Sequence, residues 1–144
     1  MYEPEEIDRH VEARLERQDV LDRRPKPIVA YVIEESVLHR PIGGGAVLKE
    51  QLAHLLGSVR TRDHLTVQVM PMEREVHAGL SGPMQLLSTR QGAESRVYGG
   101  ARRSYVDLQA GRSQPAVRPL RGTAAQALTP WESVELIERM AARP

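Results

Sequence analysis

The sequence predicts an α+β domain in which a small, mostly antiparallel curved sheet packs against N-terminal, middle and C-terminal helices. Apolar residues recur at helical spacing in three segments, and β-prone runs lie between these segments. Glycine-containing turns separate the later, shorter runs, as expected for antiparallel strands. The chain has 144 residues, which suffices for one hydrophobic core, so we expect residues 1–144 to form a single domain.

The N-terminal segment predicts an amphipathic helix from about Pro4 to Val20. Ile7, Val11 and Leu15 recur every four residues with charged residues between them, and Pro4 suits the first turn of a helix. The two prolines of the following DRRPKP stretch remove backbone donors and favour extended conformations, so they end this helix.

An apolar run and a second helix come next. Residues 28–33, IVAYVI, are apolar on both faces, which predicts a buried central strand. Leucines at helical spacing then predict a helix from about Ala46 to Leu56, and Gly57 is placed to end it. Residues 65–70, LTVQVM, alternate between apolar and polar in their first half and predict another strand.

The second half of the chain predicts short strands and one well-marked helix. MQLLS, ESRVYGG and RSYVDLQ are β-prone runs between glycine-containing turns. GRSQPAVRPLRG holds two prolines and three arginines without a period, so we expect an irregular connection there. Thr129, Pro130 and Glu132 have the spacing of a capping box with proline at the first helical position, which predicts a C-terminal helix.

Composition excludes several classes of function. The chain has 20 Lys+Arg against 19 Asp+Glu, so its net charge of +1 gives no reason to expect direct nucleic-acid binding. Cysteine is absent, the five histidines lack metal-site spacing, and no apolar run is long enough for a membrane span. We therefore expect a cytoplasmic protein without metal, cofactor or membrane contact.

Two local motifs could have either a structural or a functional role. Gly43 to Gly45 resemble a phosphate-binding turn, but Lys49 is followed by Glu50 and the P-loop pattern fails, which favours a simple helix-entry turn. Glu34 and Glu35 directly follow the apolar run 28–33. A carboxylate that is buried there needs a positively charged partner, and Arg40 is the nearest candidate in the sequence. A structural ion pair is favoured over a catalytic acid.

Four stretches in order carry a family resemblance: VEARLERQDVL; EESVLHRPIGG with KEQLAHLL; LTVQVMPMEREVHAGLSGPM; and AQALTPWESVELIERM. Together they resemble the C-terminal domain of unknown function of actinobacterial XRE-type helix-turn-helix regulators, often described as antitoxin-like. The resemblance implies a domain that senses a ligand or engages a partner. The first stretch begins at Val11, so the resemblance implies a stand-alone member or a trimmed chain, without the helix-turn-helix.

The resemblance also places individual residues. Glu35, Arg40, Gln68 and His77 fall on positions that the family tends to fill with the same residue types. Ala30, Met72 and Met84 stand where the family commonly has bulky aromatic residues, and Gly100 stands where it tends to have Glu. If these positions line one interior, smaller side chains leave a cavity, because unfilled volume in a core is costly unless a ligand occupies it.

These departures lead to two functional hypotheses. The first is a binding module that holds a small apolar or amphipathic molecule, or a small protein partner, and the chain is also a candidate homodimer. The second is a cofactor-independent enzyme of secondary metabolism, of cyclase or isomerase type, with His77 and Glu35 as catalytic groups. The predicted ligand-binding residues are Tyr31, Arg40, Gln68, Met72, His77, Met84, Tyr98 and Tyr105.

Overall fold

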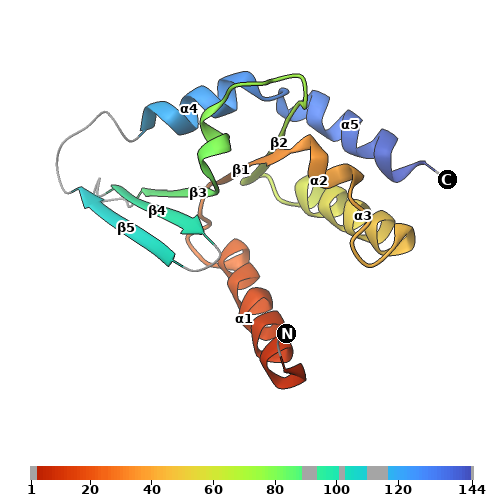
Figure 1. Cartoon of the computed structure of the whole chain (residues 1–144), viewed down its shortest axis with the longest axis horizontal. Helices are drawn as coiled ribbons and strands as arrows, with labels where there is room; N and C mark the ends of the chain where they lie inside the picture. The colour runs from red at the N-terminus through yellow and green to blue at the C-terminus, as the bar shows by residue number, and fades with distance from the viewer. Residues whose placement is uncertain (1–2, 89–93, 101–102, 110–116, 144) are drawn as a thin grey trace.

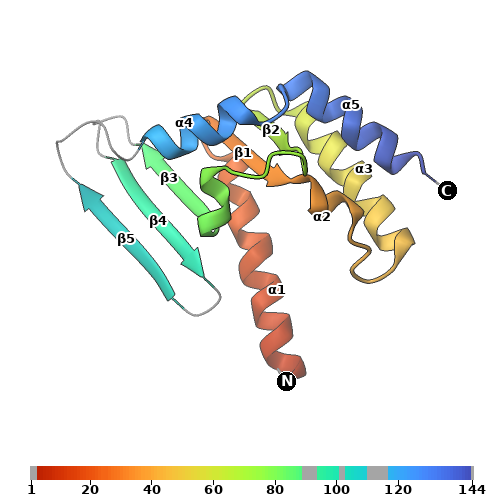
Figure 2. The same cartoon turned by 45° about the horizontal axis from the view of Figure 1, so that its top comes forward.

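The computed structural model describes residues 3–88, 94–100, 103–109 and 117–143, and side chains for residues 3–77, 79–80, 82–83 and 122–143. The chain is α+β, as predicted, with its strands in two separate sheets (Figures 1 and 2). β1 (Val29–Glu34) pairs with β2 (Leu65–Met70). The second sheet has the order β3–β4–β5, from the strands Met84–Ser88, Glu94–Gly100 and Arg103–Gln109.

The expectation of one mostly antiparallel sheet against the helices is wrong. β1 and β2 run parallel, from the Val29–Leu65 pair to the Glu34–Met70 pair, and form a small open sheet. The reason lies in the connection: α2 (Glu35–His39) and α3 (Gly45–Thr61) together return the chain to the starting edge, and such a helical crossover makes parallel strands. In the second sheet, β4 runs antiparallel to both of its neighbours, β3 and β5.

The prediction of a buried central strand at residues 28–33 is also wrong. β1 pairs with β2, and its burial pattern is mixed. Ile28, just before the strand, is 93% exposed, and Tyr31 is 49% exposed. Apolar residues on both faces of a strand do not bury it when the sheet holds two strands and the packed helices contact mainly β2.

The core lies where α3 and α5 (Pro130–Ala141) pack against each other and against β2. β2 follows the predicted alternation, with Leu65, Val67 and Val69 buried. Arg60 of α3 also donates to the carboxylate of Glu138 on α5. The buried residues of this cluster are Leu38, Leu52, Leu56, Val67, Val69, Ile137 and Met140.

One helix extends beyond its predicted bounds, and another lies partly in a segment that was predicted to be irregular. α3 continues past Gly57 to Thr61, because partly buried Val59 extends its apolar stripe and the Thr61 hydroxyl donates to the Gly57 carbonyl. α3 begins after a turn in which Gly43 and Gly44 have φ of +85° and +102°, conformations that favour glycine, as expected for a helix-entry turn. The predicted irregular segment is helical in part, since α4 covers Val117–Gln126.

α1 (Pro4–Gln18) has its predicted start and extends away from the rest of the chain in both views (Figures 1 and 2). A capping box of Glu3 and Glu6 begins it, and the short 3-10 helix η1 (Asp19–Asp22) follows it. None of its residues is buried. Its apolar stripe, predicted to pack, is about half exposed at Ile7 and Val11.

The capping box at the start of α5 is confirmed. The Thr129 hydroxyl accepts from the Glu132 amide at 3.3 Å, and the Glu132 carboxylate accepts from the Thr129 amide at 2.8 Å. Hydrogen bonds from the Thr129 side chain and then from its backbone lower the pKa of Glu132. A lowered pKa in the folded state means that this stabilisation is present above the unfolded pKa and is lost as pH falls through the folded one.

Thr129→Ala is expected to lower the free energy of unfolding by about 1 kcal/mol at neutral pH, because the α5 N-terminus loses its side-chain acceptor. The difference from the parent chain should shrink when urea unfolding is repeated at a pH below the lowered pKa of Glu132. Thr129→Ser serves as the control and should keep most of the stability. Equal stabilities of the parent and the alanine variant at neutral pH would contradict the cap.

Candidate functional site

His77 lies at the carboxyl end of the parallel strand pair, on the irregular segment 71–83 that follows β2. Its side chain is 2% exposed, and its Nε2 lies 3.5 Å from Oε1 of Glu34, the last residue of β1. Its Nδ1 is buried and has no hydrogen-bond partner within the described part of the chain. A Cβ at Gly79 would lie 2.9 Å from this Nδ1, so the backbone of η2 (Ala78–Ser81) packs directly on the ring.

Glu35 holds the same segment at a second point. Its Oε2 accepts from the Met72 amide at 3.0 Å, and its Oε1 lies 3.4 Å from Nε2 of His39. Arg40, the predicted partner of these carboxylates, is exposed and belongs to neither pair. The two adjacent glutamates thus hold the 71–83 segment across the end of the sheet. This is a structural role, as favoured from the sequence, but their side-chain partners are His77 and His39 and not Arg40.

Gln68 also has a structural position. Its side-chain amide donates to the carbonyl of Leu128 at 2.8 Å and to that of Ala124 at 3.2 Å. Both acceptors lie at the end of α4 or just after it, so Gln68 ties β2 to the segment that leads into α5. Its polar group is thereby committed to the fold, away from the pocket described below.

The predicted cavity does not form at two of its three positions. Ala30 is exposed and Met72 is 58% exposed, so neither lines an interior. The physical reason is that β1 exposes Ala30 to solvent and that Met72 lies in an exposed turn after β2, which the Arg74 amide closes by donating to the Pro71 carbonyl at 3.0 Å. The side chain of Met84 lies outside the described residues.

The remaining predicted residues fall on the antiparallel sheet. Met84 is paired with Tyr98, and Tyr98 is paired with Tyr105, so the three share one row across β3, β4 and β5. Gly100 ends β4 in a pair with Arg103. The side chains of Tyr98 and Tyr105 lie outside the described set, and their predicted role stays a prediction.

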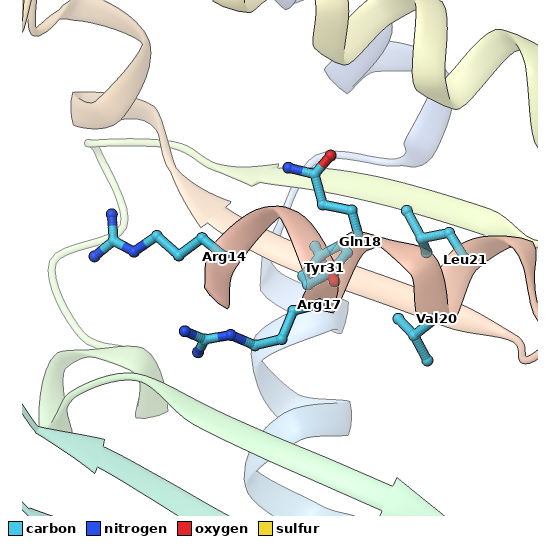
Figure 3. Close-up of a pocket in the computed structure, with 6 residues that line it drawn as sticks. All are labelled: Arg14, Arg17, Gln18, Val20, Leu21 and Tyr31. Atoms are coloured by element: carbon cyan, nitrogen blue, oxygen red, sulfur yellow. The ribbon is translucent and has the colours of Figure 1, made fainter. Parts of the chain in front are cut away.

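A pocket of about 240 Å³ lies between the end of α1, η1 and β1 (Figure 3). Two guanidinium groups come from α1, two aliphatic side chains come from η1, and a phenol ring comes from β1. Tyr31 is the one pocket residue that the sequence had singled out. The lining residues are Arg14, Arg17, Gln18, Val20, Leu21 and Tyr31.

Polar contacts hold η1 against the short segment between α3 and β2 and so fix the apolar side of this pocket. His64 donates from Nε2 to the Leu21 carbonyl at 2.7 Å, and Arg62 lies 3.5 Å from the Asp22 carboxylate. The hydrogen bond from His64 lowers the pKa of Asp63, and the charge of Lys26 lowers it further. The contacts of Leu21 and Asp22 with His64 and Arg62 join residues about 40 positions apart, so no local sequence pattern predicts them.

The charge distribution in the pocket favours an anion. Arg14 and Arg17 carry permanent positive charges, and Nε of Arg17 donates to the Ala13 carbonyl at 2.9 Å, which holds that side chain along the helix. Figure 3 shows both guanidinium groups at one end and Val20 and Leu21 at the other. No cluster of His, Asp and Glu suited to a metal ion occurs among the residues with described positions. Over the same residues, no helix is long and apolar enough to cross a membrane.

Comparison with known proteins gives one family. Residues 2–139 match the model of a family described as a domain of unknown function, DUF5753. No curated protein matches the chain, and no solved structure matches it.

Proposed function

We propose, from the premise that the chain belongs to the DUF5753 family, that it is a non-catalytic binding module for a small amphipathic anion. The observation that carries the proposal is the pocket in which two arginines and a tyrosine ring meet two aliphatic side chains. The resemblance to the sensing domain of XRE-type regulators supports a role in detecting such a molecule. The predicted cytoplasmic location is part of the same proposal.

The pocket volume limits the size of the ligand. Pockets for drug-sized ligands usually have volumes of roughly 300–1,000 Å³, and this pocket has about 240 Å³. A small aromatic acid, or the acidic end of a longer molecule, fits these limits better than a whole peptide. Arginine is suited to the acid because its planar fork binds carboxylates and sulfonates in a bidentate way.

The apolar part of the ligand would lie on Tyr31, Val20 and Leu21. Tyr31 is 49% exposed, so a ring stacked on it would remove apolar surface of both partners from water. The arginines can also stack on aromatic faces. An anion with an attached ring therefore satisfies both ends of the pocket, whereas a simple inorganic anion satisfies one.

The test uses 8-anilinonaphthalene-1-sulfonate, an aromatic sulfonate whose fluorescence rises on binding, with neutral N-phenyl-1-naphthylamine as the uncharged probe. The chain should bind the sulfonate more tightly than the neutral probe. Arg17→Ala and Tyr31→Ala should each raise the Kd of the sulfonate about tenfold, which corresponds to about 1.4 kcal/mol. Arg17→Ala should leave the Kd of the neutral probe nearly unchanged.

Arg9→Ala is the matched control. Nε of Arg9 donates to the Glu5 carbonyl four residues earlier, just as Nε of Arg17 donates to that of Ala13, but Arg9 lies two turns nearer the N-terminus of α1 and does not line the pocket. Its loss should leave both Kd values unchanged. Equal effects of Arg9→Ala and Arg17→Ala would rule out the pocket as the anion site.

The cofactor-independent enzyme, the alternative from the sequence, has weaker support. His77 is its main acid–base candidate, and the 2% exposure of that side chain leaves a substrate no direct access to the ring nitrogens. Glu35 is committed to Met72 and His39. No described contact favours catalysis over binding.

A further inference from the structure

The apolar stripe of α1 is a single ridge on a helix that buries none of its residues. Ile7, Val11 and Leu15 are 49%, 50% and 57% exposed. They lie four residues apart, so their side chains stand nearly above one another on the same face. Ridges of this i, i+4 type are the surfaces through which helices most often pack in globular proteins.

The two sides of this ridge carry opposite charges. Asp8 and Glu12 each follow a ridge residue by one position, which turns them roughly 100° to one side. Arg14 precedes Leu15 by one position, and Arg17 lies near Arg14 along the helix, so these two lie on the other side. Glu6 precedes Ile7 and lies on this side too, where its carboxylate accepts from the Glu3 amide in the capping box. From Asp8 to Arg17, one edge of the ridge is thus acidic and the other is basic.

We propose that the ridge Ile7–Val11–Leu15 docks against the same ridge of a second copy of this chain, with the two α1 helices running in the same sense. Two copies related by a two-fold axis along the helices bring the acidic edge of one against the basic edge of the other. In the opposite sense, acidic edges meet each other and basic edges meet each other. Charge complementarity therefore selects both the partner and the orientation.

The size of the helix sets the strength of this contact. α1 has 15 residues and is about 22 Å long, so a pair of such helices buries less than the roughly 1,200–2,000 Å² of a standard stable interface. The dimer should be reversible and dependent on concentration. The apolar ridge lies outside the pocket, but Arg14 and Arg17 belong to both surfaces, so the dimer and the ligand compete for these two arginines. The probe titrations are therefore made at chain concentrations below the Kd of the dimer.

Sedimentation velocity over rising concentrations tests the association. The parent chain should shift from monomer to dimer, and Val11→Lys should raise the dimer Kd more than tenfold, because it places a charge in the centre of the ridge. Ala13→Lys is the matched control on the opposite, exposed face of α1 and should dimerise like the parent. Added salt should weaken the parent dimer. A parent chain that stays monomeric, or equal effects of the two lysines, would overturn the proposal.

Cross-linking tests the orientation, and the absence of cysteine from the chain makes single-cysteine variants unambiguous. A short bis-maleimide should link two chains of Ile7→Cys, because residue 7 meets residue 7 when the helices run in the same sense. In an opposite-sense pair residue 7 would meet residue 15. Links that form only in a mixture of Ile7→Cys and Leu15→Cys would therefore refute the proposed arrangement.

Discussion

Gly79→Ala is expected to lower the free energy of unfolding by about 1–3 kcal/mol, as overpacking of a filled site does. The added Cβ would lie 2.9 Å from Nδ1 and 3.1 Å from Cε1 of His77, and 3.4 Å from Oε1 of Glu34. The imidazole is enclosed and cannot turn away without leaving Glu34. Either the ring or the η2 backbone must move, and the anchor of the 71–83 segment is weakened in both cases.

Gly57→Ala is the matched control. Gly57 lies inside α3, and a Cβ there meets nothing within 4 Å, so alanine should raise the free energy of unfolding by roughly 0.5–1 kcal/mol. Urea unfolding measures both variants. In the double variant with His77→Ala, the Gly79→Ala cost should largely disappear, because the clashing ring is absent. The same change at both glycines, or full additivity with His77→Ala, would argue against the packing described.

Ser133→Ala should also cost about 1–3 kcal/mol, because it leaves a buried amide without its acceptor. Ser133 is fully buried, and its hydroxyl accepts from the Val69 amide at 2.9 Å and donates to the Thr129 carbonyl at 2.8 Å. The Leu128 amide completes this edge by donating to the Val69 carbonyl at 2.8 Å. The start of α5 thus takes the place of a further strand beside β2.

Hydrogen exchange reports on single backbone amides, which the free energy of unfolding does not. In Ser133→Ala the Val69 amide should lose protection more than the amides of Val67 or Ile137, because its acceptor is removed directly. Ser36→Ala, at an exposed serine of α2, should change the free energy of unfolding by less than about 0.5 kcal/mol. Unchanged protection at Val69 would show that the hydroxyl is not its acceptor.

Local chemistry was enough for several elements. The start of α1, the strand β2 and the capping box of α5 each follow from interactions between residues within about four positions, and all three agree with the structure. The burial of β1 and the extent of α3 could not be predicted in this way. They depend on which other elements lie alongside, and apolar periodicity does not state that.

In the candidate site, too, some residues could be predicted from the sequence and others could not. Tyr31 was predicted as a ligand-binding residue and lines the pocket, and its binding role stays a prediction. His77 was predicted as a ligand-binding or catalytic residue, but its side chain is enclosed beside Glu34. The pocket arginines were missed because an exposed arginine on an amphipathic helix has no distinguishing pattern. Ala30 and Met72 were placed in an interior because the family resemblance aligned them with bulky aromatic residues, and both lie at the surface.

By itself the sequence determined the α+β class, the amphipathic character of α1 and the cap of α5, because period and capping act over neighbouring residues. The tertiary structure alone decided that β1 and β2 run parallel, that Ser133 closes the edge of β2, and that Glu34 meets His77. Each of these contacts joins residues more than 30 positions apart. Such contacts depend on how helices and strands pack in three dimensions, and adjacent residues in a sequence carry no direct record of that packing.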